Sequence, residues 1–452
     1  MSSLALAAPK TLSSSPTTPT LSTLCRLKVP TFTRLRLRLL SSLHSERGVE
    51  FETGGTFFRE ESRIGRDLGV LSASLYKQAH SHLRVLDAMC GCGVRSCRYL
   101  AQSGADFVQA NDANVETREV IVGNLKRVCK DGGFEGGDHF PGRWLVSHGD
   151  ANRVFSECYL KRDFFDLIDI DSFGSDSMFL RSAMLSLKLG GLLYLTNTDG
   201  FSSGGHRPDH SLAAYGAYVR PMPFPNEIGL RMLIGGAVRE ASVLGYHVTP
   251  LFSYYSYHGP VFRVMMRLQR GKLPESRHYG FIGCCNLCGD SRSFMWDKLG
   301  KISCACSIKT EVSSSIAVSG PLWTGPLHSA AYVTEMLKLS EQWGWTGDAT
   351  VTDQGKKTDL EKVLNLMIDE SDPRLPPGYI KLDKLAKRAK TDSPPLRALM
   401  NAIEKEGYAT SRSHIISNAL KTNCPMAECI QIVKELQGVS VTSSHPSNGE
   451  LA

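Results

Sequence analysis

An apolar run that ends in an acidic residue and then an aromatic one is the part of this sequence best suited to chemistry. In FDLIDIDSFGS, residues 165–175, Asp171 is followed two positions later by Phe173. A carboxylate can accept a hydrogen bond from an exocyclic amine and stabilise the positive charge developing on it, while an aromatic ring stacks on a planar base. The pair therefore suits chemistry on the amino group of a planar ring. The plainer alternative is that Asp171 ends a strand and caps the next helix.

A glycine-containing turn follows an earlier apolar run, in VLDAMCGCGVRS at residues 85–96. Gly91 and Gly93 would let the backbone approach a ligand at the carboxyl end of a strand. The spacing is not the G-x-G-x-x-G of a dinucleotide fold, so a ligand without a pyrophosphate fits better. Asp112 ends a second strand-like run, where its carboxylate could accept hydrogen bonds from ribose hydroxyls. An ordinary turn without a ligand is the alternative.

Residues 83–270 alternate strand-like and amphipathic runs with short connections. This order predicts an α/β fold with a mostly parallel, doubly wound sheet, which brings Asp112 and Asp171 to the same edge. The runs 247–259 and 261–270 are close enough in sequence to form an antiparallel pair at an edge.

Three further residues are candidate ligand contacts. Asp150 and Ala151 follow a third strand-like run, where they could meet an adenine edge, although either could equally cap a loop. Arg66 lies in the first turn of a predicted helix, where it could bind a carboxylate such as that of a methionine moiety. A surface ion pair with Asp67 is the alternative.

Several ordered blocks between Phe51 and Glu435 resemble the tRNA (guanine-26, N2) dimethyltransferases, in particular a plant organellar-type member. The blocks are GRDLGVL, VLDAMCGCGVRS, NDAN, HGDANRVF, FDLIDIDSFGS, GGLLYLTNTDG, RPMPFPNEIGLRMLIG, GPLWTGPLH and KLAKRAKTDSPPLRALMNAIEKEGY. The resemblance implies a class I S-adenosylmethionine-dependent methyltransferase with a smaller C-terminal α+β domain, acting on the amino group of a tRNA guanine. It also assigns Asp171 as the catalytic acidic residue, and cofactor contacts to Arg66, Arg95, Asp112, Asp150 and Ala151.

The chain departs from the family pattern in three blocks. The family reads N-R-D, D-P-F/Y-G and C-H-E where this chain has Gly65-Arg66-Asp67, Asp171-Ser172-Phe173-Gly174 and Pro225-Asn226-Glu227. Ser172 removes a proline that would stiffen the catalytic turn. Two other functions therefore stay open: a tRNA-binding paralogue without the chemistry, and a methyltransferase for ribosomal RNA, protein or a small amine.

Five of the thirteen cysteines gather between residues 284 and 306. The pairs Cys285-x-x-Cys288 and Cys304-x-Cys306 suit a tetrahedral Zn²⁺ site, with Cys284 a possible substitute ligand. Free thiols are the alternative. The other cysteines, in a chain without a secretory signal, indicate a reducing compartment.

The first 45 residues carry six basic side chains and no acidic one, among many Ser and Thr. This composition predicts a transit peptide for the chloroplast or, alternatively, the mitochondrion. A disordered basic arm is the other interpretation. Subtracting these six charges from the formal +7 leaves about +1, so affinity for tRNA must come from local patches. No apolar run reaches the ~20 residues of a membrane helix.

The predicted domains are a transit peptide (1–45), a methyltransferase domain (46–270), a cysteine-containing connector (271–350), a winged-helix-like module (351–438) and a disordered tail (439–452). The module's first helix carries a basic run, which we expect to contact the tRNA backbone; a solvated basic face is the alternative. Its members are Lys381, Lys384, Lys387, Arg388 and Lys390. The oligomeric state is not indicated by the sequence.

Overall fold

The computed structural model describes residues 43–129, 133–134, 142–271, 278–304, 306, 316–346 and 359–438. The predicted transit peptide lies outside these residues, apart from its last three, which belong to strand β1 (Leu43–Glu46). Strand β2 (Val49–Glu52) pairs with β1 in an antiparallel two-stranded sheet. The predicted tail, residues 439–452, also lies outside the described residues.

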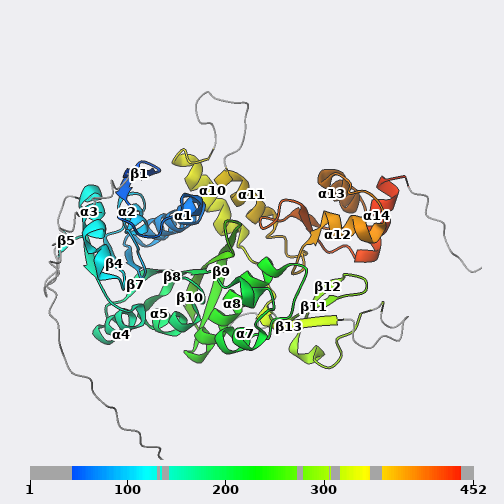
Figure 1. Cartoon of the computed structure of the whole chain (residues 1–452), viewed down its shortest axis with the longest axis horizontal. Coiled ribbons are helices and arrows are strands. Elements are labelled where there is room, and N and C mark those ends of the chain that lie inside the picture. Colours follow the sequence, from blue (N-terminus) through cyan, green and yellow to red (C-terminus); the bar gives the residue numbers. More distant parts are fainter. Residues whose placement is uncertain are drawn as a thin grey trace, which may run out of the picture. The chain divides into compact units, whose positions relative to one another are not determined.

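A mixed eight-stranded sheet positions the candidate site (Figure 1). Its strands, in spatial order, are β5 (Gly133–Phe134), β6 (Trp144–Ser147), β4 (Phe107–Asn111), β3 (Arg84–Asp87), β7 (Phe165–Asp171), β8 (Leu187–Asn197), β10 (Val261–Arg270) and β9 (Tyr246–Ser256). All neighbours are parallel except β10, which is antiparallel to β8 and β9. The predicted parallel sheet and its antiparallel edge pair are both confirmed.

Helices cover both faces of this sheet, as expected for strands that are apolar on both sides. On β3, Val85 belongs to one buried core and its neighbour Leu86 to the other, because successive side chains point to opposite faces. One core contains α1 (Arg63–His80), α2 (Val94–Ala101) and α3 (Arg118–Val128). The other contains α4 (Ala151–Lys161), α5 (Leu180–Ser186) and α8 (Pro225–Val243). The short helices α6 (Gly200–Ser203) and α7 (Pro208–Tyr215) precede α8.

Two helices that the sequence did not predict extend the α1 side. They are α10 (Ala330–Gln342) and α11 (Asp359–Asp369). Met336 and Leu364 are fully buried in the same core as Leu71 of α1. Helix α10 lies before the predicted boundary between residues 350 and 351, and α11 lies after it. Both helices nevertheless contribute to the buried core on the α1 side of the central sheet. Residues 347–358 lie outside the described residues.

The cysteine-containing segment forms a separate antiparallel sheet in the order β12-β11-β13. Its strands are β11 (Tyr279–Cys285), β12 (Ser291–Phe294) and β13 (Ile316–Trp323). Trp323, at the end of β13, is buried and donates a 2.8 Å hydrogen bond to the carbonyl oxygen of Pro326.

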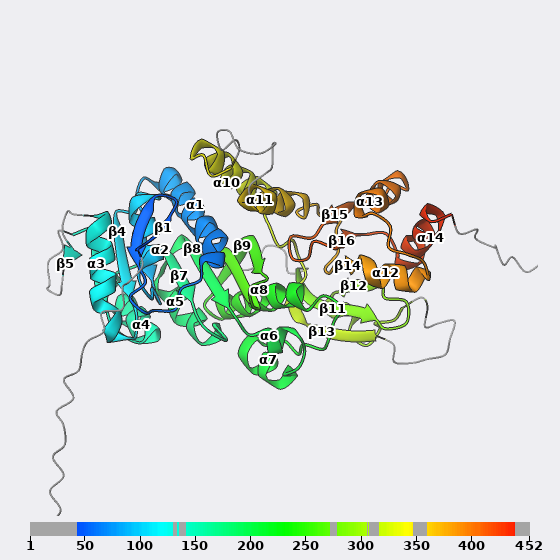
Figure 2. The ribbon, with the colours of Figure 1, turned by 45° about the horizontal axis from the view of Figure 1, so that its top comes forward.

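The C-terminal module contains three helices and three strands (Figure 2). In chain order they are β14 (Ile380–Lys381), α12 (Leu382–Ala389), α13 (Leu396–Lys405), β15 (Thr410–Arg412), β16 (Ala419–Thr422) and α14 (Met426–Leu436). The antiparallel sheet has the order β14-β16-β15. Leu385, Leu399 and Val433 belong to the module's own core. The winged-helix-like character of the module stays a prediction.

No helix in the described ranges is long and apolar enough to cross a membrane.

Candidate active site

A cavity of about 690 Å³ lies at the carboxyl edge of the central sheet. Strands β3, β4 and β7 end there. Asp171, the last residue of β7, is in the cavity wall, and the turns after the three strands supply Gly91, Asp112 and Phe173. The carboxyl edge of a doubly wound sheet is where ligands bind in this class of fold. Arg66 and Arg95 line the same cavity, so the structure brings six of the predicted site residues together.

The glycine turn leaves open space beside its backbone. Gly91 and Gly93 have φ angles of +56° and +80°, which side chains rarely adopt, and a Cβ added at Gly91 would meet no atom within 4 Å. Gly91 lines the cavity, and its amide donates a 2.9 Å hydrogen bond to Oδ2 of Asp112. Gly93 does not line the cavity; it is the residue before α2. The two glycines thus have different roles, one beside the cavity and one in starting the helix.

Asp87, at the end of β3, fixes the start of α2 beneath the turn. Its Oδ2 accepts hydrogen bonds from the amide (3.1 Å) and hydroxyl (2.7 Å) of Ser96. Burial, followed by the nearby charge of Asp169, raises the pKa of Asp87 to about 8. The carboxyl is fully buried, so it acts within the protein rather than on a ligand.

Two buried arginines surround the carboxylate of Asp171. The Arg95 guanidinium lies 2.9 Å from Oδ2 of Asp171 and 2.8 Å from Oδ2 of Asp169. Arg263, on β10, lies 3.6 Å from Oδ1 of Asp171. Burial alone would raise the pKa of Asp171, but Arg95 and then Arg263 lower it below its usual value. Asp171 is thus held as a carboxylate whose side chain is 32% exposed.

Two exposed aromatic rings lie beside this carboxylate. Phe173 and Phe57 both line the cavity, and their ring centroids are 5.0 Å apart in an edge-to-face arrangement. Both remain largely exposed, at 72% and 61% of their surfaces. Exposed phenyl rings at a cavity wall are unusual packing residues but suit the stacking of a planar ligand.

Arg66 and Arg95, the predicted carboxylate-binding arginines, both have protein partners. Arg66 lines the cavity and forms a buried ion pair with Glu46. Asp67 is fully buried and pairs instead with Arg47 and Arg98. The alternative of a surface ion pair between residues 66 and 67 is therefore wrong, because both side chains are buried and have different partners.

Asp150 and Ala151 lie away from the cavity wall. Asp150 precedes α4 as its N-cap, where Oδ1 accepts a 3.3 Å hydrogen bond from the amide of Arg153, and Ala151 is buried. The loop-cap interpretation is confirmed for Asp150. Their assigned contact with an adenine stays a prediction.

A sequence model of the N2,N2-dimethylguanosine tRNA methyltransferases matches residues 44–434. The chain belongs to this family. It is 27% identical to the tRNA (guanine(26)-N(2))-dimethyltransferase of Pyrococcus abyssi over 83% of this chain and 92% of the relative. It is 29% identical to that of Metallosphaera sedula over 86% and 91%. The fold matches a structure of Trm1 from Pyrococcus horikoshii with S-adenosyl-L-methionine, with a TM-score of 0.68, 24% identity and coverage of 84% of this chain and 94% of that one.

At Ser172, hydrogen bonds join the turn after β7 to the end of strand β8 and to the residue that follows Asn197. The Ser172 hydroxyl is buried and donates a 3.0 Å hydrogen bond to the carbonyl oxygen of Thr196. Gly174 donates through its amide to the Thr198 hydroxyl at 2.6 Å and accepts from the Thr198 amide at 2.9 Å. These bonds hold the turn that follows Asp171.

We expect Ser172→Ala to lower methyl transfer more than Ser172→Pro does. Alanine removes the hydrogen bond to Thr196, worth about 1 kcal/mol, whereas proline restricts the backbone of the same turn. Single-turnover rates with saturating tRNA would measure the difference. A rate for Ser172→Ala equal to wild type would show that this hydrogen bond does not hold the turn.

Several cavity residues were missed by the sequence reasoning because they come from outside the strand ends. Phe57 and Arg59 lie in a loop before α1, and Arg263 lies on β10. Two consecutive aromatics and an arginine after the glycines of TGGTFFREES were the available signal for the loop. The sequence contained no comparable signal for Arg263, because an arginine within an apolar strand can equally face solvent.

The four predicted zinc ligands are brought together by the β11–β12 turn and the segment after β12. The sulfurs of Cys285, Cys288, Cys304 and Cys306 all lie within 4.8 Å of one another. Three sulfur pairs are 3.4 Å apart. Cys284 is not in this group: it is buried in the apolar core, and burial followed by the nearby Cys285 raises its thiol pKa to about 11. Cys284 as a substitute ligand is therefore wrong.

Proposed function

We propose that this chain transfers methyl groups from S-adenosylmethionine to the exocyclic N2 amine of a tRNA guanine, at guanine 26. The observation that carries the proposal is the carboxylate of Asp171, held by Arg95 and Arg263 beside the exposed rings of Phe57 and Phe173. The family relatives in Pyrococcus abyssi and Metallosphaera sedula are named for this reaction.

The other part of the cavity fits the methyl donor. The open space beside Gly91 admits a ligand close to the backbone. Asp112 directly follows β4 and lines the cavity, where its carboxylate can accept hydrogen bonds from ribose hydroxyls. S-adenosylmethionine, when bound, would supply a methyl group already activated by its sulfonium. Arg66 also lines this cavity, and its guanidinium remains our predicted contact for the donor's carboxylate.

The target base would enter beside Asp171. A guanine turned out of the RNA stack could lie against the exposed rings of Phe57 and Phe173. The Asp171 carboxylate would accept a hydrogen bond from the N2 amine and stabilise the positive charge formed as the amine acquires its methyl group. Because Arg95 and Arg263 lower the pKa of Asp171, it is a weak base. It would therefore orient the amine and receive a proton only once the methylated nitrogen becomes acidic.

A methyl-transfer assay with unmodified tRNA tests this function. Purified protein incubated with labelled S-adenosylmethionine should transfer label to tRNA, but not to ribosomal RNA or total protein. Label on another acceptor would support a methyltransferase for a different substrate. Binding of tRNA without any transfer would support a tRNA-binding paralogue, the alternative raised by Ser172 and by Pro225-Asn226.

We also propose that the four clustered cysteines bind Zn²⁺. Thiolates at about 2.3 Å from a tetrahedral zinc lie roughly 3.8 Å apart, within the range of sulfur separations in this cluster. Metal analysis should find one zinc per chain in the wild type and a lower content in Cys288→Ser, with Cys284→Ser as the matched control. A wild-type protein that contains no bound metal would contradict the proposal and favour free thiols.

Residues 1–45 are proposed to direct the chain to the chloroplast, with the mitochondrion as the alternative. The support is their composition, with six basic residues and no acidic one. A fluorescent protein fused after residue 45 should accumulate in plastids, and replacing the six basic residues with glutamine should prevent this. A cytosolic wild-type fusion would contradict the proposal.

A further inference from the structure

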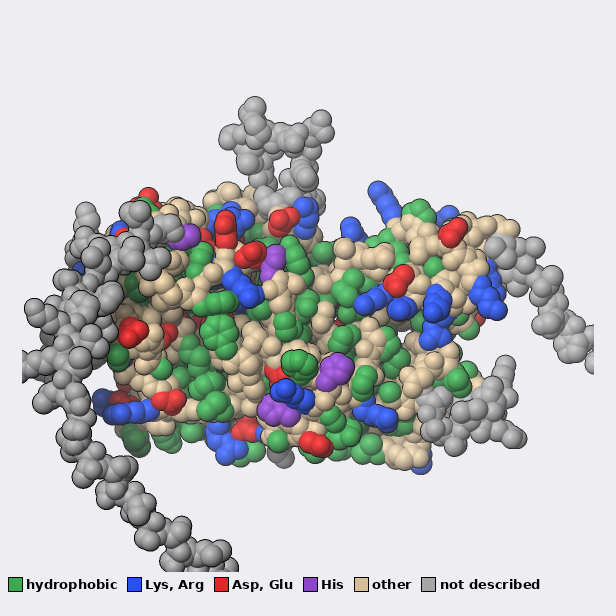
Figure 3. Space-filling model, in the orientation of Figure 1, with side chains coloured by type: hydrophobic (Ala, Val, Ile, Leu, Met, Phe, Trp, Pro, Cys, Tyr) green, Lys and Arg blue, Asp and Glu red, His purple; other side chains and the backbone are tan. Residues whose placement is uncertain are grey.

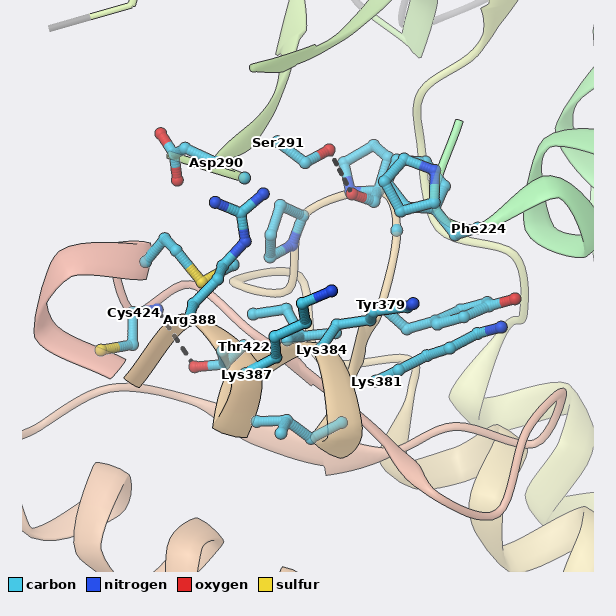
Figure 4. A pocket seen from close by; sticks show the side chains of 18 residues that line it. Phe224, Asp290, Ser291, Tyr379, Lys381, Lys384, Lys387, Arg388, Thr422 and Cys424 are labelled. Atoms are coloured by element: carbon cyan, nitrogen blue, oxygen red, sulfur yellow. Dashed lines mark hydrogen bonds between the residues drawn. The ribbon is translucent and has the colours of Figure 1, made fainter. Parts of the chain in front are cut away.

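The charged side chains outside the candidate active site differ in burial and in assigned role. Lys and Arg side chains gather over the C-terminal module (Figure 3). In Figure 4, Lys384, Lys387 and Arg388 extend from α12 into a cavity of about 540 Å³. These three belong to the basic run already expected to contact tRNA. The carboxyl of Asp176 has no such assignment, although it is fully buried and lies five residues after Asp171.

Asp176 lies at the far end of the turn that carries Phe173. Its side chain does not line the cavity of the candidate active site. It precedes the short 3-10 helix η3 (Ser177–Phe179), but its carboxylate makes no cap hydrogen bond to that helix. Instead, Oδ1 accepts hydrogen bonds from Nδ2 of Asn197 at 3.0 Å and from the hydroxyl of Tyr215 at 3.1 Å. The carboxyl therefore joins the turn after β7 to the end of β8 and to α7.

Tyr215 leads this network back to the turn. Because its hydroxyl donates to Asp176, it can accept a hydrogen bond from the hydroxyl of Ser175, which lies 2.7 Å away. It also accepts a hydrogen bond from Nδ2 of Asn197. The turn that carries Phe173 is thus held at its far end by side chains of β8 and α7.

The bond to Asp176 differs in kind from the other attachments between this turn and β8. Those of Ser172 and Gly174 join neutral groups. Hydrogen bonds to an ionised acceptor are about twice as strong as bonds between neutral groups. The carboxylate of Asp176 therefore supplies the strongest of the three attachments. Phe173 is largely exposed, so its position depends mainly on the backbone of this turn rather than on packing.

No ion pair compensates the charge of Asp176 in the part of the chain that the structure describes. The helices packed around η3 are α5, α7 and α8. Their charged and titratable side chains are Arg181, Asp209, His210, Tyr215, Glu227, Arg231, Arg239 and Glu240. Only Tyr215 is hydrogen-bonded to Asp176, and Asp199, in the segment after β8, lies 3.5 Å from His210 instead.

The protonated form of Asp176 would hold the turn less well than the carboxylate. Burial raises the pKa of Asp176 to about 6, although the hydrogen bonds from Asn197 and Tyr215 act in the opposite direction. Oδ2 has no hydrogen-bond partner among the described residues, so a proton added there would be a buried donor without an acceptor. Protonation would also remove the charge that strengthens the bonds at Oδ1.

We propose that Asp176 is a positioning residue for methyl transfer, whose buried carboxylate holds the turn that carries Phe173 against the end of β8. With this end of the turn fixed, the ring meets the target base in one orientation, and less ordering is left for the transition state. This inference rests on the proposed function, because methyl transfer is the reaction that the turn would serve.

The test compares the wild type with Asp176→Asn, which keeps the shape and an acceptor oxygen but removes the charge. At pH 7 and saturating tRNA and S-adenosylmethionine, its single-turnover rate should be about tenfold lower, as for one lost charged hydrogen bond. Affinity for tRNA should be unchanged, because Asp176 does not line the cavity. Hydrogen exchange of the backbone amides of residues 172–176 should be faster in the variant at the same pH.

A rate profile against pH separates the charge from a merely structural role. The wild-type rate should fall about fivefold between pH 7 and pH 5 as the carboxyl becomes protonated, whereas that of Asp176→Asn should stay level. Asp171 remains a carboxylate in this range because its pKa is lowered. The matched control is His210→Gln, which removes a titratable side chain of α7 that does not touch Asp176 and should keep the wild-type profile.

Equal rates and equal hydrogen exchange for Asp176→Asn and the wild type at pH 7 would overturn the inference and leave the proposed function intact. A profile that becomes level in His210→Gln but not in Asp176→Asn would assign the pH dependence to His210 and would also overturn it. A wild type that transfers no methyl group would contradict the proposed function. In that case faster exchange in Asp176→Asn would still show that the carboxylate holds the turn.

Discussion

Replacing Asp171 with alanine is expected to lower the rate of methyl transfer to tRNA by about 10²–10⁴-fold. The variant loses the acceptor that would hold the N2 amine and the charge that would stabilise it in the transition state. It also leaves the buried guanidinium of Arg95 with one carboxylate partner instead of two, Asp169. Single-turnover kinetics at saturating tRNA and S-adenosylmethionine would measure the effect.

Two controls separate loss of chemistry from loss of the fold. Asp171→Asn keeps an acceptor oxygen of similar shape but removes the charge, so its rate should lie between those of alanine and the wild type. Binding of S-adenosylmethionine, measured by calorimetry, should change little in Asp171→Asn because Gly91 and Asp112 are untouched. An alanine variant as active as the wild type would exclude Asp171 from catalysis.

Replacing Lys421 with methionine is expected to destabilise the protein by about 3–5 kcal/mol. Lys421, on β16 of the C-terminal module, lies 2.7 Å from Oε2 of Glu227 on α8 and 3.8 Å from Oε2 of Glu370 at the end of α11. All three side chains are at most 3% exposed. The substitution therefore leaves two buried carboxylates without this cation. The thermal unfolding temperature should fall by several degrees, whereas the exposed Lys405→Met should leave it nearly unchanged.

The loss of folding stability in Lys421→Met should depend on pH in a defined direction. Burial alone would raise the pKa of Glu227, but Lys421 and then Arg231 lower it below its usual value. A carboxylate with a lowered pKa in the folded state stabilises the protein above its unfolded pKa and loses that contribution as the pH falls. Without Lys421, burial favours the protonated form. The difference in stability between variant and wild type should therefore be largest near pH 7 and smaller near pH 4 to 5. A difference that does not vary with pH would show that lost packing, not unpaired charge, is the cause.

The sequence predicted those parts of the fold and site that depend on local patterns. Strand ends are marked by apolar runs that stop at a polar residue, so the positions of Asp112 and Asp171 along the chain were enough to predict that both lie at one sheet edge. The turn at Gly91 is likewise a local signal, confirmed by its positive φ angle. The cysteine spacing predicted the sulfur cluster for the same reason.

The remaining site residues depend on contacts between distant segments. Arg263 meets Asp171 because β10 lies beside β8 in the sheet, and no local pattern gives that order. Glu227 and Lys421 are 194 positions apart, so their buried ion pair could not be expected from spacing. Helix α10 packs on α1, and α11 packs on α10, again through contacts that no local pattern gives. From the sequence, Ser172 indicated only the loss of a proline. The hydrogen bond from its hydroxyl to Thr196 on β8 depends on the neighbouring strand, which the local sequence does not show.

Identification of the methylated nucleoside is the measurement that tests the central claim most directly. Unmodified tRNA treated with the protein and S-adenosylmethionine would be digested and analysed by mass spectrometry, beside the same tRNA with guanine 26 replaced by adenine. The account predicts N2-methylguanosine, its N2,N2-dimethyl form or both in the first tRNA and neither in the second. Methylation of a guanine ring nitrogen, or of another nucleoside, would contradict it.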